Sequence, residues 1–235
     1  MKPTGIICAV ERELKPFLEV ITNEAIHTHA SVTFHEGMIG GTRVIALYSG
    51  VCKVNAAIAA QALIDRFDVE RVIVSGTAGG MDRRLKIGDT VIATEVAYHD
   101  MDEGILTEYH PWMKDIYFYA DEHLLSLSKH IVKEHHFPQS VFLGRIVTGE
   151  AFIDQDGREQ INQRLDPLCV DMETAAIAHV CYANKTPFIA VRSISDTEEL
   201  SGEENFSRHC DIAAKNSFHF TELLLKYISA NHHEE

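Results

Sequence analysis

Short apolar runs alternate with helix-like segments from one end of the chain to the other, and this alternation restricts the possible folds more than any other feature. It predicts a largely parallel or mixed β-sheet that is covered by helices. No linker or low-complexity tract interrupts the pattern, so residues 1–235 are expected to form a single α/β domain. With 235 residues, 46% of them hydrophobic, the chain can bury a large core.

The apolar periodicity gives an expected order of elements. It predicts strands at 5–10, 32–36, 43–48, 72–74, 90–97, 141–147, 168–170 and 188–194. Helices are expected at 11–18, 53–67, 121–135, 157–165, 173–182 and 206–228. The strands at 32–36 and 43–48 should form a hairpin, since glycines lie between them. Residues 99–120 are the least periodic, and we interpret this long excursion as a lid or an oligomer contact.

Charge and cysteine content limit the possible partners and location. The chain has 21 Lys and Arg against 35 Asp and Glu, a formal net charge of −14, which opposes binding to nucleic acid or to an acidic membrane. Five cysteines, an odd number without a C-x-x-C pair, indicate a reducing cytoplasm. The apolar stretch at 5–10 ends at Glu11, too early for a signal peptide or a membrane span.

Polar side chains follow four of the predicted strands. Glu11 and Glu13 follow the first, the glycine-rich stretch 76–80 follows 72–74, residues 171–173 follow 168–170, and residues 192–196 complete 188–194. Ligands of open α/β sheets bind beyond the carboxyl ends of the strands. If these strands are neighbours, three carboxylates and an arginine share one edge of the sheet.

Each of these residues also has a purely structural interpretation. Acidic residues at helix starts are favoured by the helix dipole, so capping is the better single explanation for Glu11, Asp171 or Glu173, and Asp196 could be a turn residue. The stretch SGTAGG at 75–80 lacks the G-x-G-x-x-G spacing and the lysine of a P-loop. Alone it predicts only a tight turn or backbone N–H groups that face a polar ligand.

Metal and serine-nucleophile chemistry have no support in the sequence. None of the 14 histidines has the spacing of a zinc site, and Ser75 does not lie in a G-x-S-x-G elbow. We therefore expect neither a metal nor a cofactor.

Eight blocks along the chain resemble the 5′-methylthioadenosine/S-adenosylhomocysteine nucleosidases, within the wider purine nucleoside and uridine phosphorylase superfamily. The resemblance covers nearly the whole chain, and it implies a three-layer α/β/α fold with a central mixed, twisted sheet. The blocks are GIICAVERE (5–13), SGVCKV (49–54), GTAGG (76–80), LKIGD (85–89), YHD (98–100), GEAFI (149–153), VDMETAAIAHV (170–180) and VRSISD (191–196).

The resemblance implies hydrolysis of the N-glycosidic bond of methylthioadenosine, S-adenosylhomocysteine and 5′-deoxyadenosine. The products are adenine and a 5-substituted ribose, as in methionine and S-adenosylmethionine salvage. Because the transition state resembles an oxocarbenium ion, the leaving base must be protonated, the ribose cation stabilised and a water delivered.

For the base, the resemblance implies that Asp196 is the general acid that protonates adenine N7, held by Ser195. Phe152 resembles the ring that stacks on adenine, and the backbone of Ile153 resembles the group that recognises the edge of the purine. The other base-side candidates for substrate binding are Ala78 and Gly79.

For the water and the sugar, Glu13 resembles the residue that positions and deprotonates the water, helped by Arg192, Thr77 and Glu173. Glu173 also matches the carboxylate that bonds the ribose hydroxyls, and Met172 packs on the sugar. Asp171 is a further substrate-binding candidate. The family frequently has the longer glutamate at position 171 and a serine at position 77.

The 5′ substituent is expected in an apolar pocket formed by Val10, Val51 and Phe206. The family completes this pocket with a loop from the second subunit of a homodimer, which matches residues 101–112 here. Leu106 and Pro111 are the candidates for the partner's contribution, although this loop is shorter and differently composed.

Three other functions remain as alternatives. A phosphorylase would use phosphate in place of water, but Arg192 is the one cation that the sequence places at the site, and Glu13 would repel the anion. A non-catalytic nucleoside-binding module would not require Glu13, Glu173 and Asp196 together. A dinucleotide-binding domain would require the absent glycine fingerprint.

Overall fold

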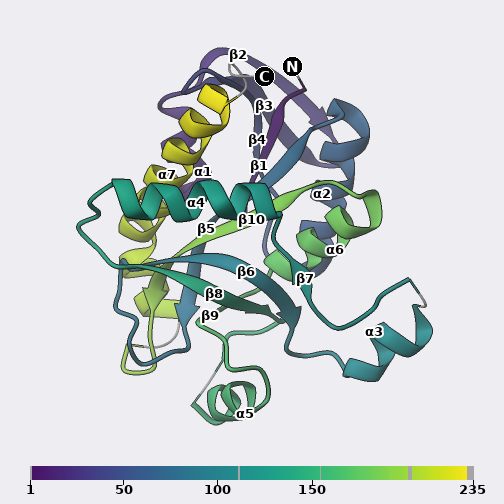
Figure 1. Ribbon diagram of the computed structural model, residues 1–235, viewed down its shortest axis with the longest axis vertical. Coiled ribbons are helices and arrows are strands. Elements are labelled where there is room, and N and C mark those ends of the chain that lie inside the picture. The colour runs from purple at the N-terminus through teal and green to yellow at the C-terminus, as the bar shows by residue number, and fades with distance from the viewer. Residues whose placement is uncertain (1, 111, 154, 201–202, 232–235) are drawn as a thin grey trace.

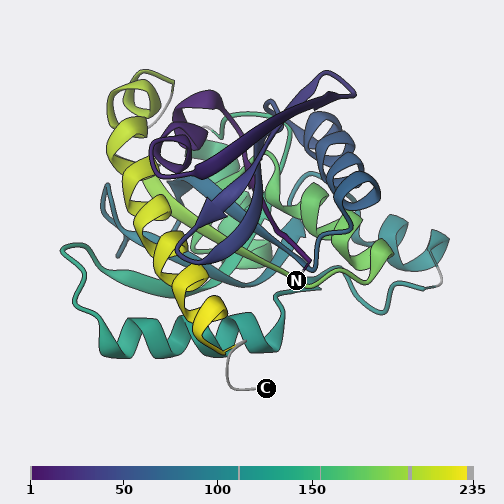
Figure 2. The same cartoon turned by 90° about the horizontal axis from the view of Figure 1, so that it is seen from above.

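The protein has three layers, with a mixed β-sheet between two layers of helices (Figures 1 and 2). The computed structural model describes residues 2–110, 112–153, 155–200 and 203–231. One layer contains α1 (Glu11–Leu18), α4 (Glu122–Glu134) and α7 (Glu203–Asn231); the other contains α2 (Lys53–Phe67) and α6 (Thr174–Asn184). The expected α/β/α architecture is confirmed.

Strand pairing brings several carboxyl ends to one edge of the sheet. Strand β5 pairs in parallel with β1 on one side and with β10 on the other. Strand β9 joins the end of β5 in antiparallel fashion. The bounds of these four strands are β1 (Thr4–Cys8), β5 (Arg71–Gly80), β9 (Cys169–Asp171) and β10 (Phe188–Asp196). The predicted meeting of the polar strand ends is therefore confirmed.

Part of the sheet closes on itself. Strand β10 pairs with β5 and also with β6, and β6 continues through β8 and β9 back to β5. Beyond β1 the sheet extends outward through β4, β3 and β2. The bounds of these outer and ring strands are β2 (Thr22–His29), β3 (Val32–Ile39), β4 (Thr42–Tyr48), β6 (Thr90–Tyr98) and β8 (Val141–Thr148).

Each face of the sheet carries its own apolar core. Alanines and Leu63 of α2 pack with α6 on one face, and Phe17 and Phe220 from α1 and α7 are fully buried on the other. A satellite cluster joins α5 (Gln155–Leu165) to the ring through Ile161 and Leu165. The spacing of these residues explains the helices, since an apolar stripe at three- and four-residue intervals must face the sheet.

Three features differ from the sequence-based expectation. Strand β2 was not predicted, because each of its residues is exposed and its sequence lacks apolar alternation. The excursion at 99–120 contains a short helix, α3 (Glu103–Tyr109), and a short strand, β7 (Phe118–Tyr119). The tight turn expected at 76–80 is wrong, because β5 continues to Gly80 and pairs there with β9.

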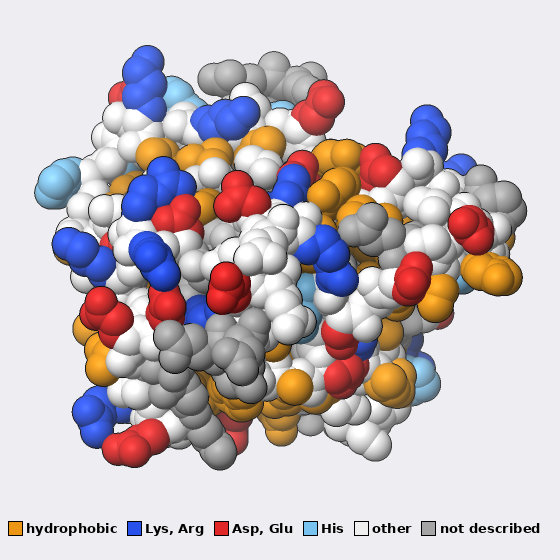
Figure 3. All heavy atoms as spheres, turned by 90° about the horizontal axis from the view of Figure 1, so that it is seen from below, with side chains coloured by type: hydrophobic (Ala, Val, Ile, Leu, Met, Phe, Trp, Pro, Cys, Tyr) orange, Lys and Arg blue, Asp and Glu red, His pale blue; other side chains and the backbone are white. Residues whose placement is uncertain are grey.

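The visible surface is mixed in charge. On the face in Figure 3, lysine and arginine side chains lie singly among acidic ones. Within the described ranges, none of the helices combines the length and the apolarity that a membrane crossing requires.

Candidate active site

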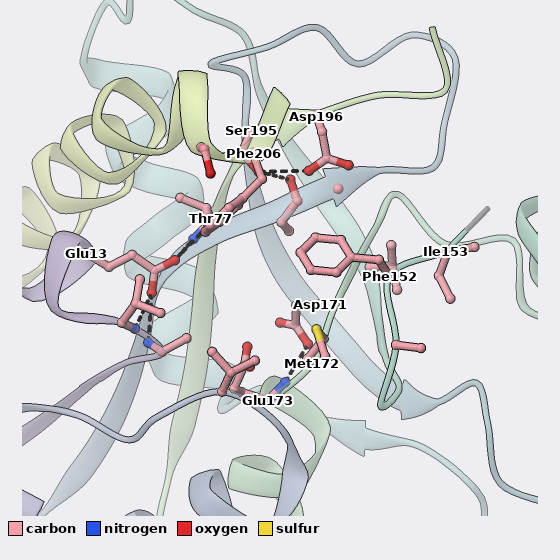
Figure 4. A pocket seen from close by; sticks show the side chains of 18 of the residues that line it. Glu13, Thr77, Phe152, Ile153, Asp171, Met172, Glu173, Ser195, Asp196 and Phe206 are labelled. Atoms are coloured by element: carbon pink, nitrogen blue, oxygen red, sulfur yellow. Dashed lines mark hydrogen bonds between the residues drawn. The ribbon is translucent and has the colours of Figure 1, made fainter. Parts of the chain in front are cut away.

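A cavity of about 270 Å³ opens where β1, β5, β9 and β10 end (Figure 4). It brings together fourteen of the residues that the sequence predicted for the site: Val10, Glu13, Val51, Thr77, Ala78, Gly79, Phe152, Ile153, Asp171, Met172, Glu173, Ser195, Asp196 and Phe206. Among its acidic groups, Asp171 and Asp196 end strands, and Glu173 follows two residues after β9. The sheet therefore positions the polar part of the cavity.

Glu13 both caps a helix and reaches the cavity. One carboxylate oxygen, Oε2, accepts from the backbone N–H of Ala9 at 2.8 Å and of Val10 at 3.3 Å, at the start of α1. The other, Oε1, accepts from the N–H and the hydroxyl of Thr77, both at 2.7 Å. Four donors thus hold this buried carboxylate in a single orientation at the cavity wall.

The glycines of β5 allow charged side chains to approach the strand. A Cβ atom at Gly76 would lie 2.5 Å from Arg192 Nη1 and 2.6 Å from Glu13 Oε2. A Cβ atom at Gly79 would lie 2.9 Å from Asp196 Oδ2. Glycine is therefore needed in this stretch because it has no side chain, and not because the backbone adopts an unusual conformation.

Arg192 is a fully buried cation on β10. Its Nε lies 2.9 Å from Asp171 Oδ2, and its Nη2 lies 3.4 Å from Glu173 Oε2 and donates to the Thr174 hydroxyl at 3.0 Å. Its third nitrogen, Nη1, has no hydrogen-bond partner among the described residues. Arg192 does not line the cavity itself but holds the carboxylates that do.

Glu173 lies between two donors at the start of α6. Oε1 accepts from the backbone N–H of Cys52 at 3.0 Å, while Oε2 faces Arg192. Burial raises the pKa of Glu173 to about 7, although Arg192 opposes the shift. Cys52 has φ 79° and ψ 161°, a conformation that favours glycine, so the turn that supplies this N–H is strained.

Asp171 is occupied by partners within the protein. Oδ1 accepts from the Thr148 hydroxyl at 2.6 Å and from the backbone N–H of Thr174 at 3.1 Å, and Oδ2 accepts from the Thr174 hydroxyl and pairs with Arg192. The capping interpretation of Asp171 is therefore confirmed. Although it lines the cavity, it orients Arg192 and the first turn of α6.

Asp196 lies at the end of β10 and is nearly buried. Its Oδ1 accepts a hydrogen bond from the Ser195 hydroxyl at 2.9 Å (Figure 4). Burial raises the pKa of Asp196, while the Ser195 hydrogen bond and the positive charges of Arg158 and His209 lower it. The net effect is upward, so burial favours the protonated acid.

The rest of the wall is apolar or aromatic. Phe152 and Phe206 meet edge to face with ring centroids 6.2 Å apart, so a segment before α5 and the start of α7 close one side together. Phe152 remains 55% exposed, and Val51 41% exposed. These rings and valines can contact the flat or apolar parts of a ligand.

Within the described ranges, no group of three or more His, Cys, Asp or Glu side chains is arranged to hold a metal ion.

Comparison with known proteins identifies the family. The model of the phosphorylase superfamily matches residues 3–228. A 5′-methylthioadenosine/S-adenosylhomocysteine nucleosidase of Bacillus subtilis is 38% identical over 97% of this chain and 99% of its own length. This chain belongs to that nucleosidase family and to the phosphorylase superfamily. A nucleosidase of the same name from Tolumonas auensis is 35% identical over 95% of this chain.

Solved structures of nucleosidases share the fold. The enzyme from Neisseria meningitidis, in complex with methylthio-immucillin-A, superposes with a TM-score of 0.88 at 31% identity, covering 97% of this chain and all of its own. A futalosine hydrolase of Helicobacter pylori is also similar, with a TM-score of 0.87 at 28% identity over 96% of this chain and 98% of its own.

Leu106, predicted to act from a second subunit, lies outside the cavity of its own chain. Leu106 is 3% exposed and packs in the core of its own chain, so its side chain presents almost no surface to another subunit. Its neighbour Ile105 is 47% exposed. Pro111 lies outside the described residues.

The sequence analysis missed several residues of the nucleosidase site. Arg158 lines the cavity and faces Asp196, and the other additions are Ala9, Ala151, Val170 and Ser207. A signal for Arg158 exists in the sequence. It lies three positions before Ile161 and seven before Leu165, so a charged residue occupies the apolar stripe of α5.

Replacing the carboxyl of Asp196 should change the pH dependence of stability. Because its pKa is higher in the folded than in the unfolded chain, the folded chain binds more protons, and stability decreases as the pH rises between the two values. Asp196→Asn removes this pH-dependent loss of stability, so the melting temperature of the variant should rise relative to that of the wild type as the pH increases through that interval. Thermal unfolding between pH 4 and 9 measures the difference.

Asp211→Asn is the matched control. Arg12 lowers the pKa of the exposed Asp211, so its substitution affects the pH dependence of stability only at lower pH, and its melting temperature should stay parallel to that of the wild type from about pH 5 upward. A melting-temperature difference for Asp196→Asn that stays constant with pH would contradict the role of burial.

Proposed function

We propose that this cavity hydrolyses the N-glycosidic bond of 5′-methylthioadenosine and S-adenosylhomocysteine, and also of 5′-deoxyadenosine. The products are adenine and a 5-substituted ribose, in the salvage of methionine and S-adenosylmethionine. The observation that carries the proposal is the placement of an acid, Asp196, and a base, Glu13, at separate points of one cavity wall with Glu173 also on it (Figure 4).

At the base end, Asp196 acts as the general acid. Burial raises its pKa, which keeps a larger fraction protonated than at the surface, and Ser195 orients the carboxyl. Proton transfer to purine N7 draws electrons from the glycosidic bond. We place the adenine ring against Phe152, with the backbone of Ile153 and the strand end at Ala78 and Gly79 beside it.

At the sugar end, Glu13 acts as the general base. Four donors orient its carboxylate, and Arg192 Nη1 approaches the same position beside Gly76. We propose that Glu13 positions the attacking water while Thr77 holds its carboxylate, and that Arg192, behind the cavity wall, contributes through its charge. Glu173 accepts the ribose hydroxyls, and Met172 packs on the sugar.

The comparisons support this class of substrate. The Neisseria meningitidis nucleosidase was solved with methylthio-immucillin-A, and that of Colwellia psychrerythraea, 33% identical over 95% of this chain with a TM-score of 0.87, was solved with adenine. We place the 5′ substituent against Val10, Val51 and Phe206, whose apolar surface suits a methylthio group.

The charges at the cavity favour water over phosphate as the nucleophile. Arg192 is paired with Asp171 and Glu173, and Arg158 faces Asp196. Each guanidinium that the described residues place at the cavity therefore already has a carboxylate as its neighbour. Glu13 adds a further carboxylate at the position proposed for the nucleophile. A phosphate dianion would be repelled there.

Adenine release in phosphate-free buffer tests the proposed reaction. The purified protein should cleave methylthioadenosine at a rate that added phosphate does not increase, and the sugar product should carry no 1-phosphate. Adenine release that requires phosphate would indicate a phosphorylase instead. No release with or without phosphate would contradict the proposed substrates.

Glu13→Gln should retain substrate binding but lose turnover. An amide cannot accept the water's proton, and loss of a general base lowers the rate by about 10²–10⁴-fold. The matched control is Glu11→Gln, an exposed acid in the same helical turn, which should behave as the wild type. Steady-state kinetics and adenine-analogue binding measure both, and near-normal turnover in Glu13→Gln would refute the assignment.

We propose that the chain forms a homodimer through α2 and α3. Val54 and Ile58 of α2, together with Ile105 and Tyr109 of α3, are between 46% and 74% exposed in the single chain. Trp112, 59% exposed, follows on the same side, where its carbonyl accepts from a hydroxyl of α6. Such apolar surface favours association. Because Leu106 is buried in its own chain, Pro111 is the residue of the predicted pair that we keep as a contributor to the partner's cavity.

Sedimentation velocity tests the dimer. The wild type should sediment as a dimer at micromolar concentration, and Val54→Glu should shift it toward the monomer because a charge would be buried at the interface. Ile212→Glu on α7 is the control, since that side chain is also exposed but lies in another layer. A monomeric wild type would contradict the proposal.

We also propose a cytoplasmic location and a single domain at 1–235. All five cysteines are free, and the family model spans both halves of the chain without interruption.

A further inference from the structure

Arg158 is a buried cation that the proposed reaction does not by itself require. It is 5% exposed and lies on the apolar stripe of α5, beside Ile161 and Leu165. A charged side chain at such a position is costly unless specific partners hold it. Its partners therefore indicate what it does.

Those partners attach Arg158 to the end of β5 and to Asp196. Nη1 donates to the carbonyl of Gly80 and lies 3.4 Å from Met81 Sδ. Nη2 lies 3.6 Å from Asp196 Oδ2, and Nε has no hydrogen-bond partner among the described residues. The contact with the strand holds the guanidinium in place so that one edge faces the carboxyl.

The two oxygens of Asp196 consequently have different surroundings. Oδ1 accepts the hydrogen bond of Ser195, whereas Oδ2 faces the guanidinium and the backbone of Gly79. A guanidinium is always charged and only donates, so it favours the carboxylate form. Its position therefore opposes the effect of burial on the same group.

Other charged or titratable groups also act around this pair. His209 of α7 lowers the pKa of Asp196, as Arg158 does, whereas Glu198 offsets the charge of Arg158 from the segment after β10. The thiol of Cys169 on β9 is buried nearby, and its own pKa is raised well above the usual value. Arg158 acts from close by, since its Nη2 lies 3.6 Å from Asp196 Oδ2.

Arg158 also separates two cavities. It lines the cavity described above and, on its other side, a polar hollow of about 600 Å³ bordered by Asp82, Glu159 and Glu198. The guanidinium is therefore part of the wall between Asp196 and that hollow.

We propose that Arg158 is a positioning residue for Asp196, which holds Oδ2 and sets how readily the carboxyl gives up its proton. This inference rests on the proposed role of Asp196 as the general acid. A lower pKa makes Asp196 a stronger donor but leaves less of it protonated at neutral pH, and Arg158 sets this balance. Removing the cation should therefore extend activity toward higher pH.

The pH dependence of kcat/KM for methylthioadenosine tests the proposal. Arg158→Gln removes the charge but retains polar atoms, and its alkaline limb should move upward by about one pH unit, because a cation at this distance lowers a carboxyl pKa by at least that amount. Arg158→Lys retains a positive charge, but an ammonium group cannot contact Gly80 and Asp196 at the same time. The alkaline limb of its pH profile should therefore shift to higher pH by a smaller amount.

Arg164→Gln is the matched control on the same helix. Arg164 donates to the carbonyl of His99 at the surface and has no contact with the cavity, so its profile should match the wild type. Thermal unfolding of each variant verifies the fold. If Arg158→Gln does not fold, the direction of the shift in Arg158→Lys decides the question.

The outcomes separate this inference from the proposed function. If Asp196→Asn loses turnover but neither Arg158 variant moves the alkaline limb, Arg158 has only a structural role and the inference is wrong. If Asp196→Asn keeps its turnover, the assignment of the general acid fails instead. A lowered kcat in Arg158→Gln with an unmoved limb also contradicts the inference.

Discussion

The arrangement of the site depends on the buried guanidinium of Arg192. Asp171 and Glu173 come from β9 and the start of α6, and both contact this one side chain from β10. Glu13 approaches from α1 and lies with the guanidinium beside Gly76. Without a cation at the centre, three buried carboxylates would repel one another, and leaving such groups unpaired costs about 3–5 kcal/mol. The ion network thus joins separate layers of the fold and holds the reacting groups.

Much of the site could be predicted because strand ends are visible in the sequence. Residues that follow apolar runs, such as Glu13 and Asp196, must lie at the edge of a parallel sheet, and the pairing of β1, β5 and β10 brought them together. Glu13 also combines a capping contact with a place on the cavity wall, since one oxygen faces the helix start and the other faces Thr77. Roles for these residues nevertheless came from the family resemblance rather than from their spacing.

The rest depended on contacts that local patterns do not contain. The glycines at 76 and 79 were expected in a turn, yet they lie in a strand that pairs with β10, and charged side chains from distant segments occupy the space beside them. Strand β2 was missed because it is an exposed edge strand whose pairing with β3 requires no apolar alternation. Arg158 was missed because a single charge within an apolar helical stripe has meaning only once its partner is known.

The closed ring of strands has a consequence for how the protein opens. Strands β5 and β10, which carry Thr77 and Asp196, each pair with strands on both sides over part of their length, and the amide hydrogens of such central strands are among the slowest to exchange with solvent. Phe152, in contrast, lies on a connecting segment outside the ring. Asp196 and the hydroxyl that holds Glu13 thus belong to strands of this closed ring. A ligand that enters past the exposed ring of Phe152 breaks none of the strand hydrogen bonds.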